Sequence, residues 1–139
     1  VICGSCGRVF GRKVWNSTSE KLRRIVWQCN GKYLAKGEKG CGSRHIDDGV
    51  LYQAFVDVFN AMVENKDYFL GKFKGLRESD NPLRRYKAKQ FSKIITEAER
   101  INEFDTDLYF ASIEKVIVYN GGRLMLSLLD GTEVECVIE

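Results

Sequence analysis

The stretch Cys3-Gly-Ser-Cys-Gly7 decides the fold at the start of this chain. A CxxC pair brings two sulfurs to one metal ion from a tight turn, and the glycines within and after the pair supply the permissive backbone that the turn needs. Two more cysteines follow at Cys29 and Cys41, and the eleven residues between them include three glycines. Four thiolates fill a tetrahedral coordination sphere. The sequence therefore predicts one structural zinc ion held by Cys3, Cys6, Cys29 and Cys41.

Other uses of these cysteines fit the pattern less well. His45, the single histidine, lies four residues after Cys41 and remains an alternative fourth ligand. Disulfides are disfavoured because an odd count of five cysteines, with no signal peptide or transmembrane run, indicates a reducing cytosol. A redox CxxC precedes a helix, whereas a basic, strand-like stretch follows here. Cys136 alternates with apolar neighbours and is predicted to be a small buried residue.

The charge of the chain is divided unevenly at His45. Residues 1–45 carry ten Lys and Arg against two acidic residues, a net of +8, while residues 46–139 carry twelve against seventeen, a net of −5. A compact, zinc-held lobe with this excess of positive charge is typical of a nucleic-acid contact. The alternative is a basic surface that is simply solvated.

Two strand-like runs follow the first cysteine pair, at Val9 to Trp15 and Arg23 to Cys29, with a turn-like Asn-Ser-Thr-Ser between them. They predict a β-hairpin, and a two-stranded ribbon is thin enough to enter a DNA major groove about 12 Å wide. The alternative is that its apolar side chains pack on one face while its arginines are solvated on the other. The predicted DNA-contacting residues are Arg8, Arg12, Lys13, Arg23, Arg24, Lys32, Lys36 and Arg44.

Helices are predicted in the middle of the chain. Asp47 is a typical N-cap, and the residues that follow it form an apolar stripe at helical spacing, Leu51, Phe55, Phe59 and Met62, as far as about Asn65. A shorter helix is expected over residues 66–77. Asn81-Pro82 is typical of the start of a helix, so a third helix is expected from there to about Arg100. Asp105 is the expected N-cap of a fourth, short helix.

Three strand-like runs close the chain, at residues 113–119, 123–129 and 133–138. Asn-Gly and Asp-Gly between apolar runs are strong hairpin signals, so these runs predict an antiparallel meander. The expected fold class is α+β: a zinc ribbon with a β-hairpin, two to three amphipathic helices and a C-terminal three-stranded meander. The expected domains are a basic, DNA-contacting zinc ribbon (1–45), a helical segment (46–112) and the meander packed on the helices (113–139).

Several segments together resemble one known family. The segments are CGSCGRVFGRKVW, the WQC strand, GCGSRHID, DNPLRRYKAKQF, EFDTDLYF and the final EKVIVYNGGRLMLSLLDGTEVEC. Their order is similar to that in the C-terminal zinc ribbon region of the large serine recombinases, the integrases of phages and conjugative transposons. The resemblance implies a domain that grips the outer part of each attachment-site half during integration or excision. It also implies that the catalytic serine lies in a separate N-terminal domain absent here, so that this chain is not itself an enzyme.

The resemblance carries further expectations about partners. It implies double-stranded DNA and other recombinase subunits as partners, no membrane, and a DNA-associated protein in the bacterial cytoplasm, bacterial or phage-encoded. Family members also carry a long coiled-coil arm, but only residues 66–81 separate the two long helical stretches here, so the arm is expected to be reduced or absent. The alternative function is a protein-docking module that serves synapsis or subunit contacts.

Overall fold

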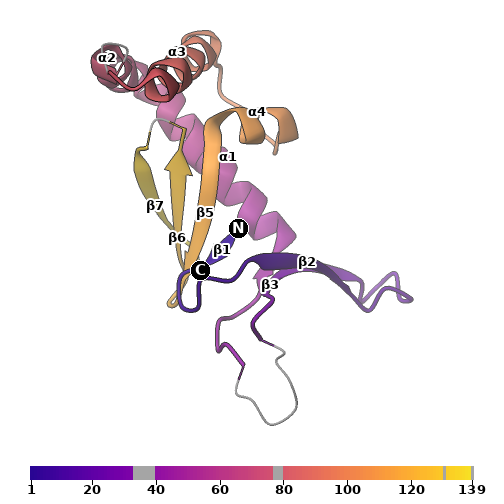
Figure 1. Cartoon of the computed structure of the whole chain (residues 1–139). Helices are drawn as coiled ribbons and strands as arrows, with labels where there is room; N and C mark the ends of the chain where they lie inside the picture. The colour runs from indigo at the N-terminus through magenta and orange to yellow at the C-terminus, as the bar shows by residue number, and fades with distance from the viewer. Residues whose placement is uncertain (33–39, 77–79, 130, 139) are drawn as a thin grey trace.

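The computed structural model describes residues 1–32, 40–76, 80–129 and 131–138, and confirms the predicted α+β class (Figure 1). Its elements are β1 (Ile2–Cys3), β2 (Phe10–Trp15), β3 (Arg24–Cys29), β4 (Ile46–Asp47), α1 (Asp48–Glu64), α2 (Lys66–Leu76), α3 (Pro82–Glu97), α4 (Thr106–Ser112), β5 (Ile113–Tyr119), β6 (Arg123–Leu128) and β7 (Glu133–Val137). The predicted hairpin, helices and meander therefore all form within this part of the chain.

The strands build two separate sheets. One is antiparallel, with the order β2-β3-β4, and the other has the order β1-β5-β6-β7. The predicted meander is the β5-β6-β7 part of the second sheet, and β1 adds a fourth strand parallel to β5, with Ile2 opposite Ile117 and Cys3 opposite Val118. The first cysteine of the chain is thus attached directly to the C-terminal sheet.

The β2–β3 hairpin projects sideways from the body of the molecule (Figure 1). Its strands pair from Phe10 opposite Cys29 at the base to Trp15 opposite Arg24 toward the tip. Directly opposed residues lie on the same face of a sheet, so Arg12, which faces Trp27, shares the face of Phe10. The alternative arrangement, with apolar side chains on one face of the hairpin and arginines on the other, therefore does not hold for Arg12.

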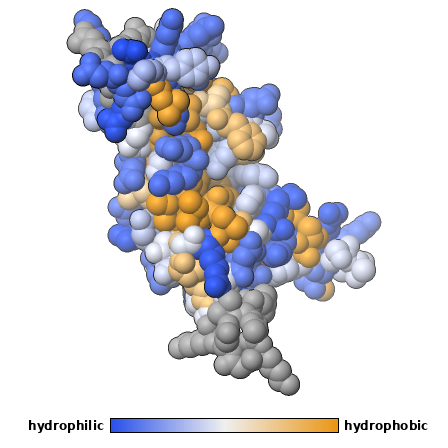
Figure 2. Space-filling view, in the orientation of Figure 1, coloured by the Kyte–Doolittle hydropathy of each residue, from blue (hydrophilic) through white to orange (hydrophobic). Residues whose placement is uncertain are grey.

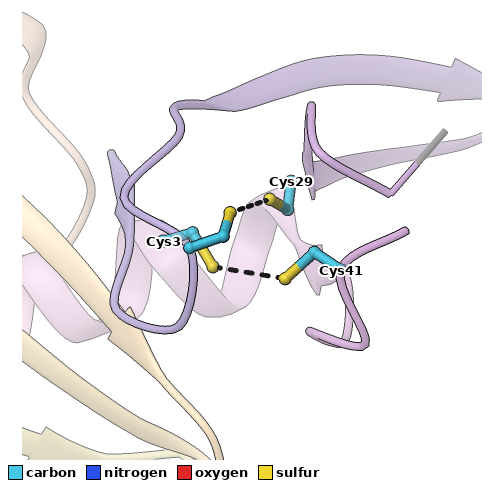
Figure 3. A group of neighbouring side chains, drawn as sticks. Cys3, Cys29 and Cys41 are labelled. Carbon is cyan, nitrogen blue, oxygen red and sulfur yellow. Dashed lines mark hydrogen bonds between the residues drawn. The ribbon is translucent and has the colours of Figure 1, made fainter. Parts of the chain in front are cut away.

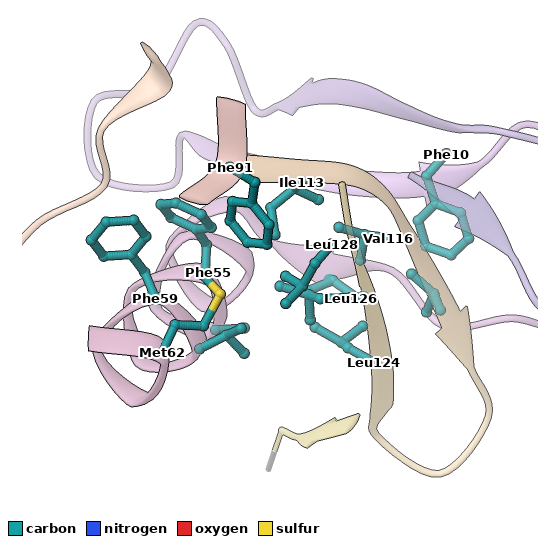
Figure 4. Packing of buried hydrophobic residues seen from close by; sticks show 14 of the residues in the cluster. Phe10, Phe55, Phe59, Met62, Phe91, Ile113, Val116, Leu124, Leu126 and Leu128 are labelled. Atoms are coloured by element: carbon teal, nitrogen blue, oxygen red, sulfur yellow. The ribbon is translucent and has the colours of Figure 1, made fainter. Parts of the chain in front are cut away.

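Helix α1 forms because its apolar residues recur on one side. Phe55, Phe59 and Met62 are each 1% exposed, and they meet side chains from α3 and the C-terminal sheet (Figure 4). Asp47 precedes the helix as predicted, but its carboxylate makes no capping bond, since it accepts hydrogen bonds from Arg24 instead. Asn81 does cap α3, by accepting from the amides of Leu83 and Arg84, and Asp105 caps α4.

A single apolar cluster holds the two sheets and the helices together. It contains Cys3, Phe10 and Cys29 from the N-terminal part, Phe91 from α3 and Leu124 from β6, among others (Figure 4). The predicted boundaries at residues 45 and 112 therefore cross one shared core, and the division into three domains stays a prediction. In Figure 2, apolar surface gathers over the middle of the body, whereas the projecting hairpin is mostly hydrophilic.

Candidate metal centre

The first cysteine pair lies on a tight, hydrogen-bonded turn. The amide of Cys3 donates to the carbonyl of Arg8 at 2.8 Å, and the amide of Gly7 donates back to the carbonyl of Cys3 at 2.9 Å. Gly7 has φ +77°, a left-handed conformation that glycine adopts without a steric penalty. Gly4 donates to the carbonyl of Val118 at 2.8 Å, which fixes the turn against β5.

The second pair is brought together by the backbone on either side of the glycine-containing loop. The amide of Lys32 donates to the carbonyl of Cys29 at 3.1 Å, and the amide of Gly31 donates to Cys29 Sγ at 3.3 Å. The amide of Cys41 donates to the carbonyl of Gly31 at 2.9 Å. These bonds close the base of the loop, so Cys29 and Cys41 meet despite their separation in sequence.

All four predicted ligands converge at one point. The Sγ atoms of Cys3 and Cys41 are 3.7 Å apart, those of Cys6 and Cys29 are 3.4 Å apart, and all four lie within 4.8 Å of one another (Figure 3). A tetrahedron with Zn–S bonds of about 2.3 Å has sulfurs about 3.8 Å apart. The size and the all-sulfur chemistry of this cluster therefore fit one zinc ion.

Ser43 is a neighbour of the sulfurs that the sequence analysis missed. Its buried hydroxyl lies 3.1 Å from Cys3 Sγ and 3.2 Å from Cys41 Sγ. Burial acts to raise the pKa of Cys3, but hydrogen bonds from Ser43 and from the backbone outweigh it and lower that pKa to about 6. The Ser43 bond also lowers the pKa of Cys41, while burial raises that of Cys29. The sequence pattern that could have indicated a role for Ser43 is the Cys-Gly-Ser that occurs at residues 3–5 and again at 41–43.

His45 is not among the converging ligand atoms. Its ring packs against Trp15, with the ring centroids 4.6 Å apart. Cys136 also lies outside the cluster. The sequence analysis predicts a buried residue here, but Cys136 lies on the edge strand β7 and is only half-buried.

Two of the predicted DNA-contacting arginines are held by carboxylates at the start of α1. Arg24 donates from Nε and Nη2 to Asp47 at 2.7 and 2.9 Å, and its guanidinium lies 5.8 Å above the Trp15 ring. Arg12 donates to Asp48 Oδ2 at 3.4 Å. Each arginine is about half exposed, so each is oriented by the protein and still open to solvent.

The remaining predicted contacts are distributed around the ribbon. The side chain of Arg8 lies over Gly31, beside Cys6 Sγ. Lys13, Arg23 and Arg44 are exposed and form no ion pair with the described residues. Lys32 is half-buried, and Lys36 lies outside the described residues. Lys21, which was not predicted, is exposed near the hairpin tip.

A four-cysteine cluster at the base of a β-hairpin defines the zinc ribbon class of small metal-binding domains. Residues 1–60 match the family described as the recombinase zinc beta ribbon domain, so the N-terminal part of this chain, which holds the four-cysteine cluster, is similar to a recombinase zinc ribbon domain. No curated protein and no solved structure matched the chain. Within the described residues, no helix has the length and apolar character needed to span a membrane.

Proposed function

We propose that this chain is a zinc-stabilised DNA-binding domain of a site-specific serine recombinase, which recognises part of the attachment site in DNA integration or excision. One observation carries the proposal: a basic hairpin projects from the body, and its base lies at the four-cysteine cluster (Figures 1 and 3). The match to a recombinase zinc ribbon supports the recombinase context. In that context the protein works on DNA in the cytoplasm, beside other recombinase subunits.

Zinc in this site would have a structural role. It would be held by Cys3, Cys6, Cys29 and Cys41, which would supply four thiolates and leave no open position for catalysis. Such a centre joins the first turn, the end of β3 and the segment after the loop. Four thiolates and Zn²⁺ leave a net charge of −2, and the guanidinium of Arg8 near Cys6 balances part of it.

The hairpin presents two kinds of cation to a polyanion. Lys13, Lys21 and Arg23 are exposed and suit phosphate contacts. Arg24 is held by Asp47 through Nε and Nη2, so both Nη1–H donors and one Nη2–H donor are not used by this carboxylate. An arginine already fixed in one orientation loses less freedom on binding, which favours Arg24 for a bidentate contact to guanine.

The salt dependence of DNA binding tests the proposal. We expect the zinc-loaded chain to bind a labelled mixed-sequence duplex with an affinity that falls as salt rises, by a slope of about −0.9 per phosphate contacted. Replacing Lys13, Lys21 and Arg23 together by Gln should reduce the magnitude of the slope by up to about 2.7. The matched control replaces Arg84, Arg85 and Lys87 of α3 by Gln, which removes the same charge from another element.

Zinc content and the thermal melting curve should be the same in both triple variants and the parent. Equal slopes for the hairpin variant and the parent would contradict a DNA-binding hairpin. A parent slope near zero would contradict DNA binding itself.

A protein-docking function is the second candidate, and one surface favours it. A groove of about 580 Å³ between α3 and α4 is lined by Leu83, Tyr86 and Phe110, whose exposed fractions are 59%, 60% and 73%. Apolar side chains gathered at this exposure are typical of contact surfaces. Binding to a recombinase subunit that survives high salt, and is lost in Phe110→Ser, would support this function.

A further inference from the structure

A second basic feature lies beside the metal centre, outside the hairpin. It is a cleft of about 560 Å³ between two parts of the chain that are far apart in sequence. One wall is the segment 42–47, which follows the last cysteine. The other is the turn between β5 and β6, at residues 119–123. The proposed hairpin contact does not use this second wall.

The charges that line the cleft are predominantly positive. Among the described residues that line it, Arg24, Arg44 and Arg123 are basic and Asp47 alone is acidic. Asp47 is bound to Arg24, so that pair is neutral. The described lining residues therefore keep a net charge of about +2, from Arg44 and Arg123.

Arg123 is held in place relative to the metal centre. Its guanidinium lies 5.4 Å from the centroid of the Tyr119 ring. The Tyr119 ring also lies against the turn that carries Cys3 and Cys6. A methyl group added at Gly4 would lie 2.6 Å from Tyr119 Cδ1, so this ring contacts the backbone of that turn. The ring thus connects Arg123 to the CxxC turn through direct packing.

The donors of Arg123 are weakly engaged. Its Nη1 is 3.7 Å from Glu135 Oε1, beyond hydrogen-bond distance, and both side chains are about half exposed. Glu135 is not among the residues that line the cleft. Arg44 is exposed and has no ion pair within the described residues. Both arginines are therefore available to an anion.

The turn between β5 and β6 leaves this wall open to a bulky group. Gly121 and Gly122 have φ values of +82° and +75°, and, apart from its two chain neighbours, no described residue has an atom within 4 Å of a methyl group placed on Gly121. Bare backbone at this point lets a tetrahedral anion with two attached sugars approach closely.

We propose that this cleft binds a phosphodiester group of the DNA backbone, with Arg44 and Arg123 as its cations. The phosphodiester reaches the cleft only if duplex DNA lies along the hairpin, so this site depends on the proposed function. Arg24, at the start of β3, lines the cleft, so the cleft adjoins the hairpin that the duplex would contact. The zinc ribbon, through the hairpin and Arg44, and the C-terminal sheet, through Arg123, would then both contact the DNA.

The test measures the binding of a labelled mixed-sequence duplex to the zinc-loaded full chain across a range of salt concentrations. Loss of one phosphate contact in Arg123→Gln should lower the magnitude of the slope by about 0.9 and weaken binding about fivefold at about 0.15 M salt. Arg123→Lys should lose less, because it keeps the charge. Arg100→Gln is the matched control, since Arg100 is also a surface arginine paired with one glutamate, Glu64, and does not line the cleft.

The outcomes separate this site from the proposed function. A parent with normal salt-dependent binding, together with an Arg123→Gln variant of equal affinity and slope, would overturn the cleft site and leave hairpin binding intact. A parent that does not bind the duplex would overturn both. If Arg123→Gln abolishes thermal stabilisation by inorganic phosphate but leaves duplex binding unchanged, the cleft takes a small anion and the phosphodiester site is wrong.

Discussion

Asp48, the first residue of α1, accepts hydrogen bonds from both strands of the projecting hairpin. Its replacement should therefore destabilise the fold by a measurable amount. Its Oδ1 accepts a hydrogen bond from Trp27 Nε1 at 2.7 Å, and its Oδ2 accepts one from Arg12 at 3.4 Å. Asp48 is also the acidic residue in the first turn of α1, where a negative charge interacts favourably with the helix dipole. One carboxylate therefore joins β2, β3 and α1.

The expected cost of Asp48→Ala follows from these contacts. A hydrogen bond to a charged group contributes about 1.5 to 3 kcal/mol, and the charge at the helix start about 0.3 to 1 kcal/mol. The longer, half-exposed contact to Arg12 adds little. We expect the free energy of unfolding to fall by about 2 to 4 kcal/mol, with the indole N–H of Trp27 left without this partner.

Urea unfolding of the zinc-loaded chain, followed by tryptophan fluorescence, measures this loss. Asp48→Asn should cost less, because it keeps an acceptor for Trp27 without the charge. The matched control is Asp57→Ala, which removes the same charge from an exposed position of the same helix, where the carboxylate accepts from Gln53. We expect that control to cost under about 0.5 kcal/mol. Equal losses in Asp48→Ala and Asp57→Ala would refute this role of Asp48.

Three further predictions concern the metal centre, the β5–β6 turn and acid stability. Cys3→Ser should lower the zinc bound per chain, measured by elemental analysis, whereas Cys136→Ser, outside the cluster, should not. Gly121→Ala should destabilise the fold by about 1 to 2 kcal/mol, because alanine is strained in the left-handed conformation. Gly122→Ala should destabilise it more, because the new methyl group would also lie 2.3 Å from the carbonyl oxygen of Ile138. Equal melting temperatures for the two variants would contradict this. A hydrogen bond from Arg24 lowers the pKa of Asp47 below its ordinary 3.8, so the pair stabilises the fold above that pH and the stabilisation is lost as pH falls through the folded pKa. The stability difference between the parent and Arg24→Gln should therefore narrow below about pH 4, and a difference that widens there in acid unfolding would show the sign to be wrong.

Much of the fold was predictable because its signals are local. Cys3 and Cys6 define a knuckle within four residues, the stripe from Leu51 to Met62 has helical spacing, and Asn81-Pro82 combines a cap with a residue suited to the first turn. Each of these patterns depends on neighbours in the chain, so no tertiary contact was needed to recognise it.

The remaining features depend on partners that are distant in sequence. Strand β1 has only two residues, and it pairs with Ile117 and Val118, more than one hundred positions later. The carboxylate of Asp47 suits a helix cap, but Arg24 lies within reach in the folded protein and binds it instead. Ser43 contacts two sulfurs only because the backbone of Cys41 bonds to Gly31 and so brings Cys41 to the other cysteines. No periodicity in the sequence reports such contacts.

Sulfur and nitrogen ligands can be distinguished directly at the metal. X-ray absorption at the zinc edge of the purified chain should show four sulfur neighbours at about 2.3 Å and no nitrogen or oxygen in the first shell. That result would match the convergence of Cys3, Cys6, Cys29 and Cys41. Three sulfurs with one imidazole nitrogen, or a chain that folds and binds duplex DNA without zinc, would contradict the view that a four-thiolate centre fixes the DNA-binding hairpin.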